Sequence, residues 1–348
     1  MFNRGKQTDA YQRRRNKQNG SIILIGIILL IGIFLISMNT GYSKLSPFVS
    51  ARALVGLGSE KEELILFGLR LPRILLSLLV GAGLALSGCV IQSVTKNPLA
   101  DPGLLGINAG AGLMVILYVL LFKAQSFLSV FTLPFLALIG AGGAAIGIYM
   151  LSYKKGEGIS PSRLVLNGIA MQAGITSLTT VCTVKLDSAQ FDFVAKWQAG
   201  SIWGSDWKFV QVLFPWLLLC IPYVFMKSRV LDVLNLGDEV SCGLGLAVEK
   251  ERKKLLGAAV VLAGTCVAVS GSISFVGLIA PHLAKRLVGS RHTLLIPCCL
   301  MIGAALLSCA DMIARVIIEP SEIPAGVVVA ILGAPYFLYL LHRNKGLS

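Results

Sequence analysis

The chain has 348 residues, of which 55% are hydrophobic and only 14% are charged, and its mean hydropathy is +0.78. A soluble protein of this length needs more charged side chains to cover its surface, so the composition excludes a soluble globular protein. The formal net charge of +14 would suit nucleic acid in a soluble protein. In a membrane protein, basic cytoplasmic segments explain that charge, and no nucleic-acid partner is expected.

Long apolar runs recur from Ile22 to Leu341, and they are continuous rather than alternating. Lipid cannot satisfy backbone polar groups, so runs of this kind cross a membrane as helices. A transmembrane β-barrel would instead show alternating apolar residues. The sequence therefore predicts an all-α, polytopic protein embedded in a lipid bilayer.

The first twenty residues are polar and basic, and an apolar run over 22–36 follows. This order resembles a signal peptide, but the residues after the run, SMNTGYSK, contain no small-x-small cleavage site. We therefore expect residues 1–20 to be a cytoplasmic tail and residues 21–348 to be a single transmembrane domain.

The apolar runs predict about ten transmembrane helices. Because ten is even, both termini lie on one side, and basic residues favour the cytoplasm, with 21 in the inner segments against 10 in the outer ones. The boundary near 269–274 is ambiguous, since Ser270-Gly271-Ser272 fits either a turn or a break in one bent segment. The runs cover residues 21–38, 71–94, 104–122, 128–151, 163–184, 208–226, 255–271, 274–289, 293–317 and 324–341.

Small residues four apart recur within several of these runs. Small side chains let helix backbones approach closely inside lipid, where no hydrophobic force drives helices together. The spacing predicts a compact bundle rather than separate helices. The pairs are Gly81/Ala85, Gly106/Gly110 and Gly143/Gly147.

The sequence holds none of the motifs expected for catalysis or nucleotide binding, since G-x-x-x-x-G-K-[ST], G-x-S-x-G and H-E-x-x-H are all missing. The eight cysteines show neither disulfide nor metal-ligand spacing, and the three histidines are scattered. We expect His282, His292 and His342 to be solvated or helix-end residues. The chain is therefore not expected to be an enzyme or to bind a cofactor or metal, and an intramembrane enzyme ranks last.

Ionisable residues inside the predicted spans are scarce, and Asp311 and Arg315 are the exception. They are four residues apart on one helix and can pair. An ion-coupled secondary transporter would be expected to place acids near the middle of the membrane. The sequence therefore favours transport energy from another source, with an ion-coupled transporter as the alternative from another class.

The segment 227–254 is the longest predicted cytoplasmic loop. It reads as a short helix that ends at Gly237, followed by a turn bracketed by Gly243 and Gly245. Its apolar residues could form a docking ridge for a cytoplasmic protein, or the loop could be an amphipathic connection on the membrane surface. Those residues lie at positions 231, 234, 236, 240, 244 and 246.

Four segments of the chain resemble the FecCD-type permeases of ABC importers, the family for iron-siderophores, haem and cobalamin. The first runs from LRLPR through GAGLALSGCVIQSVTKNPLADPGLLGINAGAG over residues 69–112. The others are LNLGDEVSCGLGL over 234–246, GSISFVGLIAPHLAKRLVG over 271–289, and ADMIARVIIEPSEIPAGVVVAILGAPYFLYLL over 310–341. With the ten-span layout, the resemblance covers nearly the whole chain outside the tail.

The resemblance implies a permease subunit in the bacterial cytoplasmic membrane. It implies a second permease subunit, two cytoplasmic ATPase subunits that bind ATP and Mg, and an extracytoplasmic substrate-binding protein. The implied cargo is a ferric siderophore, with cobalamin or haem as alternatives. The resemblance also implies that the loop 227–254 couples the permease to the ATPase. The expected coupling residues are Leu231, Leu234, Asp238, Glu239 and Gly245.

The resemblance further implies that outer-face arginines pair with carboxylates of the binding protein. The matching positions are Arg70, Arg73 and Arg315. Arginine suits this because it is always charged and presents a rigid fork to carboxylates. The alternatives are that Arg70 and Arg73 anchor the chain at the membrane interface and that Arg315 pairs with Asp311.

The resemblance places the translocation path along the fifth span. A bulky chelate must slide without being held, so weak uncharged walls are reasonable. The role of the turn at 97–102 is left open between chain reversal and contact with the ATPase side. The expected path residues are Asn167, Met171, Gln172, Thr176 and Thr180.

Overall fold

The computed structural model describes residues 2–40, 46–122, 132–154, 158–202, 204, 206–318 and 321–344, which are almost entirely helical. The only sheet among them is the antiparallel pair β1 (Tyr153–Lys154) and β2 (Gly158–Ile159). The helices are α1 (Phe2–Asn39), α2 (Pro47–Leu54), α3 (Glu60–Glu63), the π-helix η1 (Leu64–Arg70), α4 (Leu71–Thr95), the 3₁₀ helix η2 (Pro102–Leu105), α5 (Ile107–Leu121), α6 (Thr132–Ser152), α7 (Pro161–Thr183), α8 (Ser188–Gln198), α9 (Trp207–Met226), α10 (Ser228–Leu234), α11 (Asp238–Gly243), α12 (Val248–Ser270), α13 (Val276–Val288), α14 (His292–Val316) and α15 (Ala325–Asn344).

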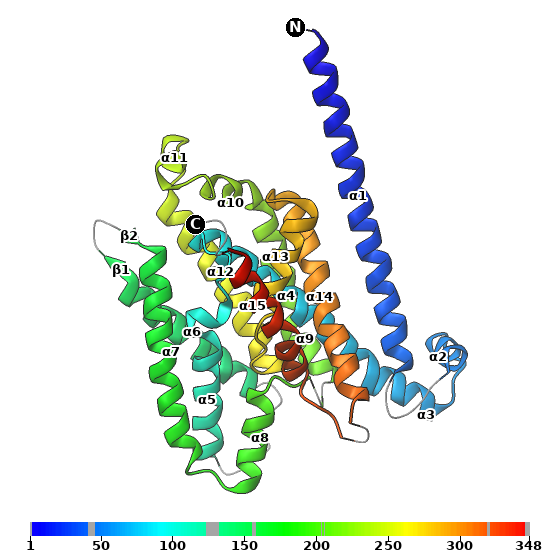
Figure 1. The fold of residues 1–348 in the computed structure, drawn as a ribbon. Coiled ribbons are helices and arrows are strands. Elements are labelled where there is room, and N and C mark those ends of the chain that lie inside the picture. The colour runs from blue at the N-terminus through cyan, green and yellow to red at the C-terminus, as the bar shows by residue number, and fades with distance from the viewer. Residues whose placement is uncertain are drawn as a thin grey trace.

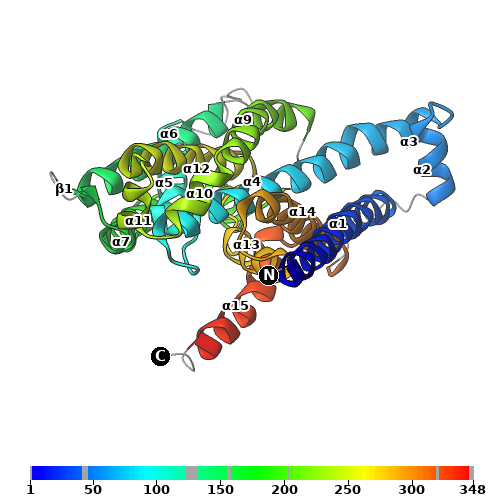
Figure 2. The ribbon, with the colours of Figure 1, turned by 90° about the horizontal axis from the view of Figure 1, so that it is seen from above.

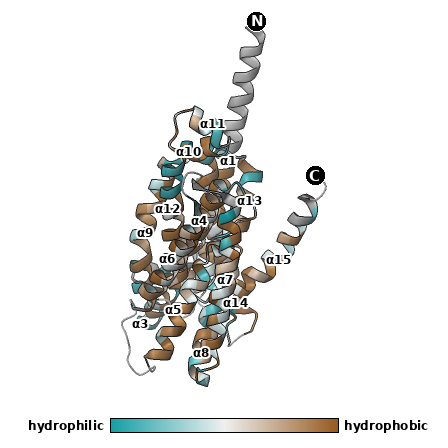
Figure 3. Cartoon of the chain, turned by 90° about the vertical axis from the view of Figure 1, so that its left-hand side faces the viewer, coloured by the Kyte–Doolittle hydropathy of each residue, from teal (hydrophilic) through white to brown (hydrophobic). Residues whose placement is uncertain are grey.

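The long helices run side by side as one bundle (Figure 1). We call the end that carries α10 and α11 the inner end, and the opposite end, which carries α8, the outer end. The start of α1 and the end of α15 both lie toward the inner end (Figure 1). Figure 3 shows hydrophilic residues gathered on α10 and α11, whereas the long helices are mostly hydrophobic.

Seven helices in the described ranges are long and apolar enough to cross a membrane, and two shorter apolar helices, Ile107–Leu121 and Ala325–Tyr339, accompany them. This confirms a helical, multi-pass membrane protein. The ambiguous boundary is a true turn, because Gly271 and Phe275 both adopt positive φ angles, +71° and +68°, and separate α12 from α13. The predicted span over 128–151 begins outside the described residues.

Helix α4 is the centre of the bundle and packs against α9, α12, α13 and α14. Of its apolar window, 78% is buried, against 11% for α7. Figure 2 shows that α15 projects from the bundle, whereas α4 is surrounded by other helices. Burial on all sides explains why α4 carries apolar and small residues around its whole circumference.

Glycines set the closest approaches of α4 to its neighbours. A methyl group on Gly81 would overlap the carbonyl of Gly303 on α14, and one on Gly88 would overlap the carbonyl of Gly277 on α13. Between α5 and α6, a methyl group on Gly110 would overlap the carbonyl of Gly140 in the same way. The prediction fails for Gly143, where a methyl group would find no other atom within 4 Å. Small-residue spacing thus locates close contacts only where a partner helix lies opposite.

Candidate functional site

The inner end is built from the segment 227–254, whose two short helices lie across the ends of α4, α12 and α14. Leu231 and Leu234 of α10 are buried and belong to the main core. Leu236, Val240 and Leu244 are exposed instead, at 60%, 51% and 64%. The predicted ridge is therefore divided: its first two residues hold α10 in place, and the later ones form a surface.

Asp238 opens α11 and joins that helix to two others. Its Oδ1 accepts a hydrogen bond from Lys96 Nζ at 2.6 Å, just after α4, and its carboxylate accepts Arg252 Nη2 of α12 at 2.9 Å. Desolvation raises the pKa of Asp238, but the hydrogen bonds from Lys96 and Arg252 outweigh it and hold the pKa below its usual value. Glu239 follows on the exposed surface of the same turn.

Gly245 closes the turn between α11 and α12 with a φ of +81° and nothing within 4 Å of a side-chain position. The backbone conformation, rather than crowding, is what favours glycine there. Gly237 precedes α11 in the same way, with a φ of +112°. The shape of this loop therefore depends on its two positive-φ glycines.

A cavity of about 660 Å³ opens at the inner end, beside α10. Its lining includes Gln92, Ser93, Asp232, His282 and His292. His292 is a helix-end residue as expected, since it begins α14, but the expectation of a solvated side chain is wrong for it because it is completely buried. The turn after α4 begins at this end, where Pro98 lines the cavity, and Asp101 in that turn accepts a hydrogen bond from the backbone N–H of Gly103 at 3.1 Å.

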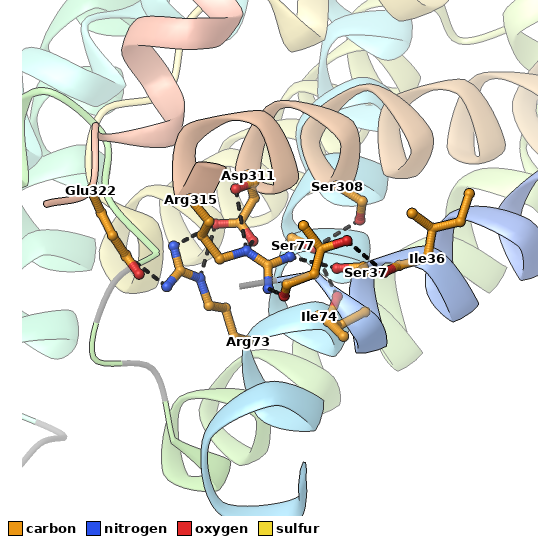
Figure 4. Close-up of polar contacts among 10 residues, drawn as sticks. Ile36, Ser37, Arg73, Ile74, Ser77, Ser308, Asp311, Arg315 and Glu322 are labelled. Atoms are coloured by element: carbon orange, nitrogen blue, oxygen red, sulfur yellow. Dashed lines mark hydrogen bonds and ion pairs between the residues drawn. The ribbon is translucent and has the colours of Figure 1, made fainter. Parts of the chain in front are cut away.

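The outer end of α4 is held by a cluster of charges (Figure 4). Arg73 Nη2 lies 2.9 Å from Asp311 Oδ1, and Arg73 Nη1 lies 2.8 Å from Glu322 Oε2. Asp311 also pairs with Arg315 at 3.2 Å, which confirms the pairing predicted from their spacing. The Asp311 side chain is only 1% exposed and those of Arg73 and Arg315 13% and 5%, so one buried carboxylate serves two guanidinium groups.

The three outer arginines also bind other parts of the chain. Arg315 donates to the Ser37 hydroxyl and the Thr40 carbonyl at the end of α1 (Figure 4 shows the Ser37 contact). Arg70 donates to the carbonyl of Met38 and is buried. These internal partners were not visible in the sequence, because the residues that meet are far apart along the chain.

The five predicted path residues lie on two faces of α7. Asn167 donates to Ser152 Oγ of α6 at 3.1 Å, and Met171 packs against Gly147 of α6. Gln172, Thr176 and Thr180 follow at four-residue intervals, so they share a different face. Thr176 and Thr180 are exposed there.

Comparison with known proteins agrees with this architecture. The model of the FecCD transport family matches residues 14–343. The chain is 46% identical over 335 residues to the iron(3+)-hydroxamate import system permease protein FhuG of Bacillus subtilis (strain 168), covering 94% of this chain and 99% of that protein. It is 42% identical over 328 residues to the Fe(3+)-citrate import system permease protein YfmE of the same organism, covering 94% and 96%.

A solved structure shows the same fold. It is an inward-facing transporter assigned to the metal-chelate ABC type, and it superposes with a TM-score of 0.82 at 30% identity, covering 93% of this chain and 99% of that one. The sequence match and the structural match both extend over nearly the full length. The chain therefore belongs to the FecCD transport family.

Proposed function

We propose that the chain is the membrane-spanning subunit of an ATP-binding-cassette importer in the bacterial cytoplasmic membrane, and that it translocates a ferric siderophore. The observation that carries this proposal is the identity of 46% to an iron-hydroxamate import permease over almost the whole of both chains. The scarcity of ionisable residues inside the spans supports an external energy source. In this proposal ATP and Mg are bound by separate ATPase subunits.

A second permease subunit would cover α7, whose apolar window is only 11% buried. Gln172, Thr176 and Thr180 would then line the path between the two subunits. Their amide and hydroxyl groups offer weak, neutral contacts to a passing chelate. Asn167 and Met171 would support the path from behind, since both contact α6.

The ATPase would dock on the exposed ridge of Leu236, Val240 and Leu244, beside Glu239. An apolar ridge on a polar cytoplasmic loop suits a protein partner, because water penalises its exposure. The positive-φ turn at Gly245 would present this ridge at a fixed angle.

The binding protein would dock at the outer end, around Arg73 and the partly exposed Glu322. Arg70 and Arg315 are tied to the end of α1, so in this proposal they shape the docking surface from below. On docking, a carboxylate of the binding protein would take the place of Glu322 beside Arg73, so that Arg73 stays paired.

Reconstitution in vesicles tests the proposal. The importer should take up radioiron supplied as a ferric hydroxamate only with ATP on the ATPase side and with its binding protein on the other side. Leu244→Glu should abolish co-purification of the ATPase, whereas Cys242→Ser, an exposed neighbour on the same turn, should not. Uptake driven by an ion gradient without the ATPase would overturn the proposal, and uptake of cobalamin or haem instead would change its cargo.

A further inference from the structure

Three side chains from three helices form a continuous hydrogen-bond chain at the inner end. Asp232 on α10 accepts the backbone N–H of His292 at 2.9 Å, and its Oδ1 lies 2.6 Å from His292 Nδ1. His292 Nε2 lies 2.7 Å from Ser93 Oγ on α4. An ionised carboxylate only accepts, so Nδ1 carries the hydrogen of the neutral ring, and the single hydrogen of the Ser93 hydroxyl is shared between Nε2 and the Cys89 carbonyl.

Two of the three side chains in this hydrogen-bond chain are shielded from water, and Asp232 is 32% exposed. His292 is fully buried and Ser93 is 8% exposed, whereas the Asp238 side chain is 47% exposed. A buried hydrogen bond is stronger than an exposed one, and an unpaired group there is costly. Exposed ion pairs contribute little because water and salt screen them. The buried chain is therefore the stronger connection between α10 and α4.

The cavity beside α10 makes this connection more important. Its walls come from α4, α10, α13 and the start of α14, and it leaves about 660 Å³ unfilled by side chains. Side-chain packing cannot transmit a displacement across an open space. The hydrogen-bond chain runs along the wall of that space and adds a polar link to the packing of Leu231 and Leu234.

We infer that Asp232, His292 and Ser93 are positioning residues that transmit movement of the loop 227–254 to α4 and α14. This inference rests on the proposed function. When α4 moves, α13 and α14 must move with it, because the backbone of α4 is in close contact with α13 at Gly88 and with α14 at Gly81. A displacement at α10 therefore moves these helices together.

The same three residue types form the catalytic triad of many hydrolases, but the geometry here differs from a catalytic one. Ser93 lies inside a regular helix, and its Oγ also lies 2.9 Å from the carbonyl of Cys89. Backbone N–H groups inside a helix are already bonded within it, so α4 cannot supply an oxyanion hole.

The test uses the reconstituted importer with its ATPase and binding protein, and a radioiron ferric hydroxamate as cargo. The measured quantity is the iron transported per ATP hydrolysed. Ser93→Ala should lower it by about tenfold, the factor expected when a hydrogen bond in a buried charged network is lost. Assembly with the ATPase and basal ATP hydrolysis should be unchanged, and Ser93→Thr, which keeps the hydroxyl, should restore transport.

Thr95→Val is the matched control. Thr95 is on the same turn of α4, is buried, and bonds only to its own helix in the contact at 2.7 Å to the Ile91 carbonyl. It should leave the ratio unchanged. If the wild-type importer transports iron and Ser93→Ala has the same ratio of iron transported to ATP hydrolysed, this inference alone is overturned. An equal loss of that ratio in Thr95→Val would overturn it as well. A wild-type complex without ATP-dependent uptake would overturn the proposed function and this inference with it.

Discussion

The two ends of α4 are fixed by different chemistry. At the outer end, Arg73 joins Asp311 and Glu322 in a largely buried ion-pair cluster. At the inner end, Ser93 meets His292 through a neutral hydrogen bond, and Lys96 forms an exposed ion pair. Separating buried charges is costly, whereas a neutral hydrogen bond and an exposed ion pair cost less to break. The outer end is therefore the more firmly held of the two.

The largest effect is expected from breaking the outer cluster. Asp311→Ala leaves Arg73 and Arg315 without their shared buried carboxylate, and should lower the free energy of unfolding by about 3–5 kcal/mol. Denaturant or thermal unfolding of the purified protein measures this. Glu322→Gln, at the more exposed edge of the cluster, should cost far less, and equal losses in the two variants would contradict a buried anchor.

The next largest loss of stability is expected in the middle of α4, which must be rigid if a displacement of its inner end is to reach its outer end. Gly88→Ala places a methyl group against the Gly277 carbonyl and should destabilise the protein by about 1–3 kcal/mol. Gly143→Ala enters open space and should be neutral or stabilising. Similar unfolding midpoints for the two variants would show that α4 is not tightly packed.

A pH-dependent effect of similar size is expected at Asp101, in the turn that follows α4. Burial raises the pKa of Asp101 to about 6, although the bond from Gly103 opposes it. The folded state therefore holds a proton that the unfolded state has already lost, and stability falls as pH rises from the usual value near 3.8 to about 6.

Asp101→Asn removes this penalty and keeps an oxygen for Gly103. It should raise stability by about 3 kcal/mol at neutral pH. Below the usual carboxyl pKa the two proteins should unfold alike. Unfolding midpoints across pH measure this, and a difference that does not change with pH would contradict it.

The smallest effect is expected at the exposed ion pair. Lys96→Gln, which leaves Asp238 paired with Arg252, should cost less than about 0.5 kcal/mol, and the cost should shrink in high salt. Because the pKa of Asp238 is lowered on folding, its contribution is present above its unfolded pKa and is lost as pH falls through its folded value. A large, salt-independent loss at neutral pH would show that the inner end is as firmly fixed as the outer one.

The sequence predicted contacts within one helix better than contacts between helices. The pairing of Asp311 with Arg315 follows from a four-residue spacing. The contact of Arg73 with Asp311 joins residues 238 apart, and that of Ser93 with His292 joins residues 199 apart, so neither had a local signal. A histidine at a predicted helix start that meets a buried serine only in space could be found by covariation but not by spacing.

The apolar ridge of the inner loop shows the same limit. The sequence indicated a short helix before Gly237, where α10 lies, but it did not indicate the helix α11 or what covers the apolar residues. Leu231 and Leu234 are covered by the chain's own core, and Leu236 and Leu244 are left exposed. The apolar runs indicated a multi-pass helical protein, and the family resemblance indicated its fold, because these depend on the whole pattern rather than on single contacts.

The bonds from Arg315 to Ser37 and Thr40 have a consequence for biosynthesis. They join the first membrane helix to one that emerges from the ribosome some 275 residues later. Until nearly the whole protein has been inserted, the outer end of the first helix therefore has only earlier partners, such as Arg70, which donates to the Met38 carbonyl. The many exposed leucine and isoleucine side chains of α1 make this helix stable in lipid before its contacts with α14 form.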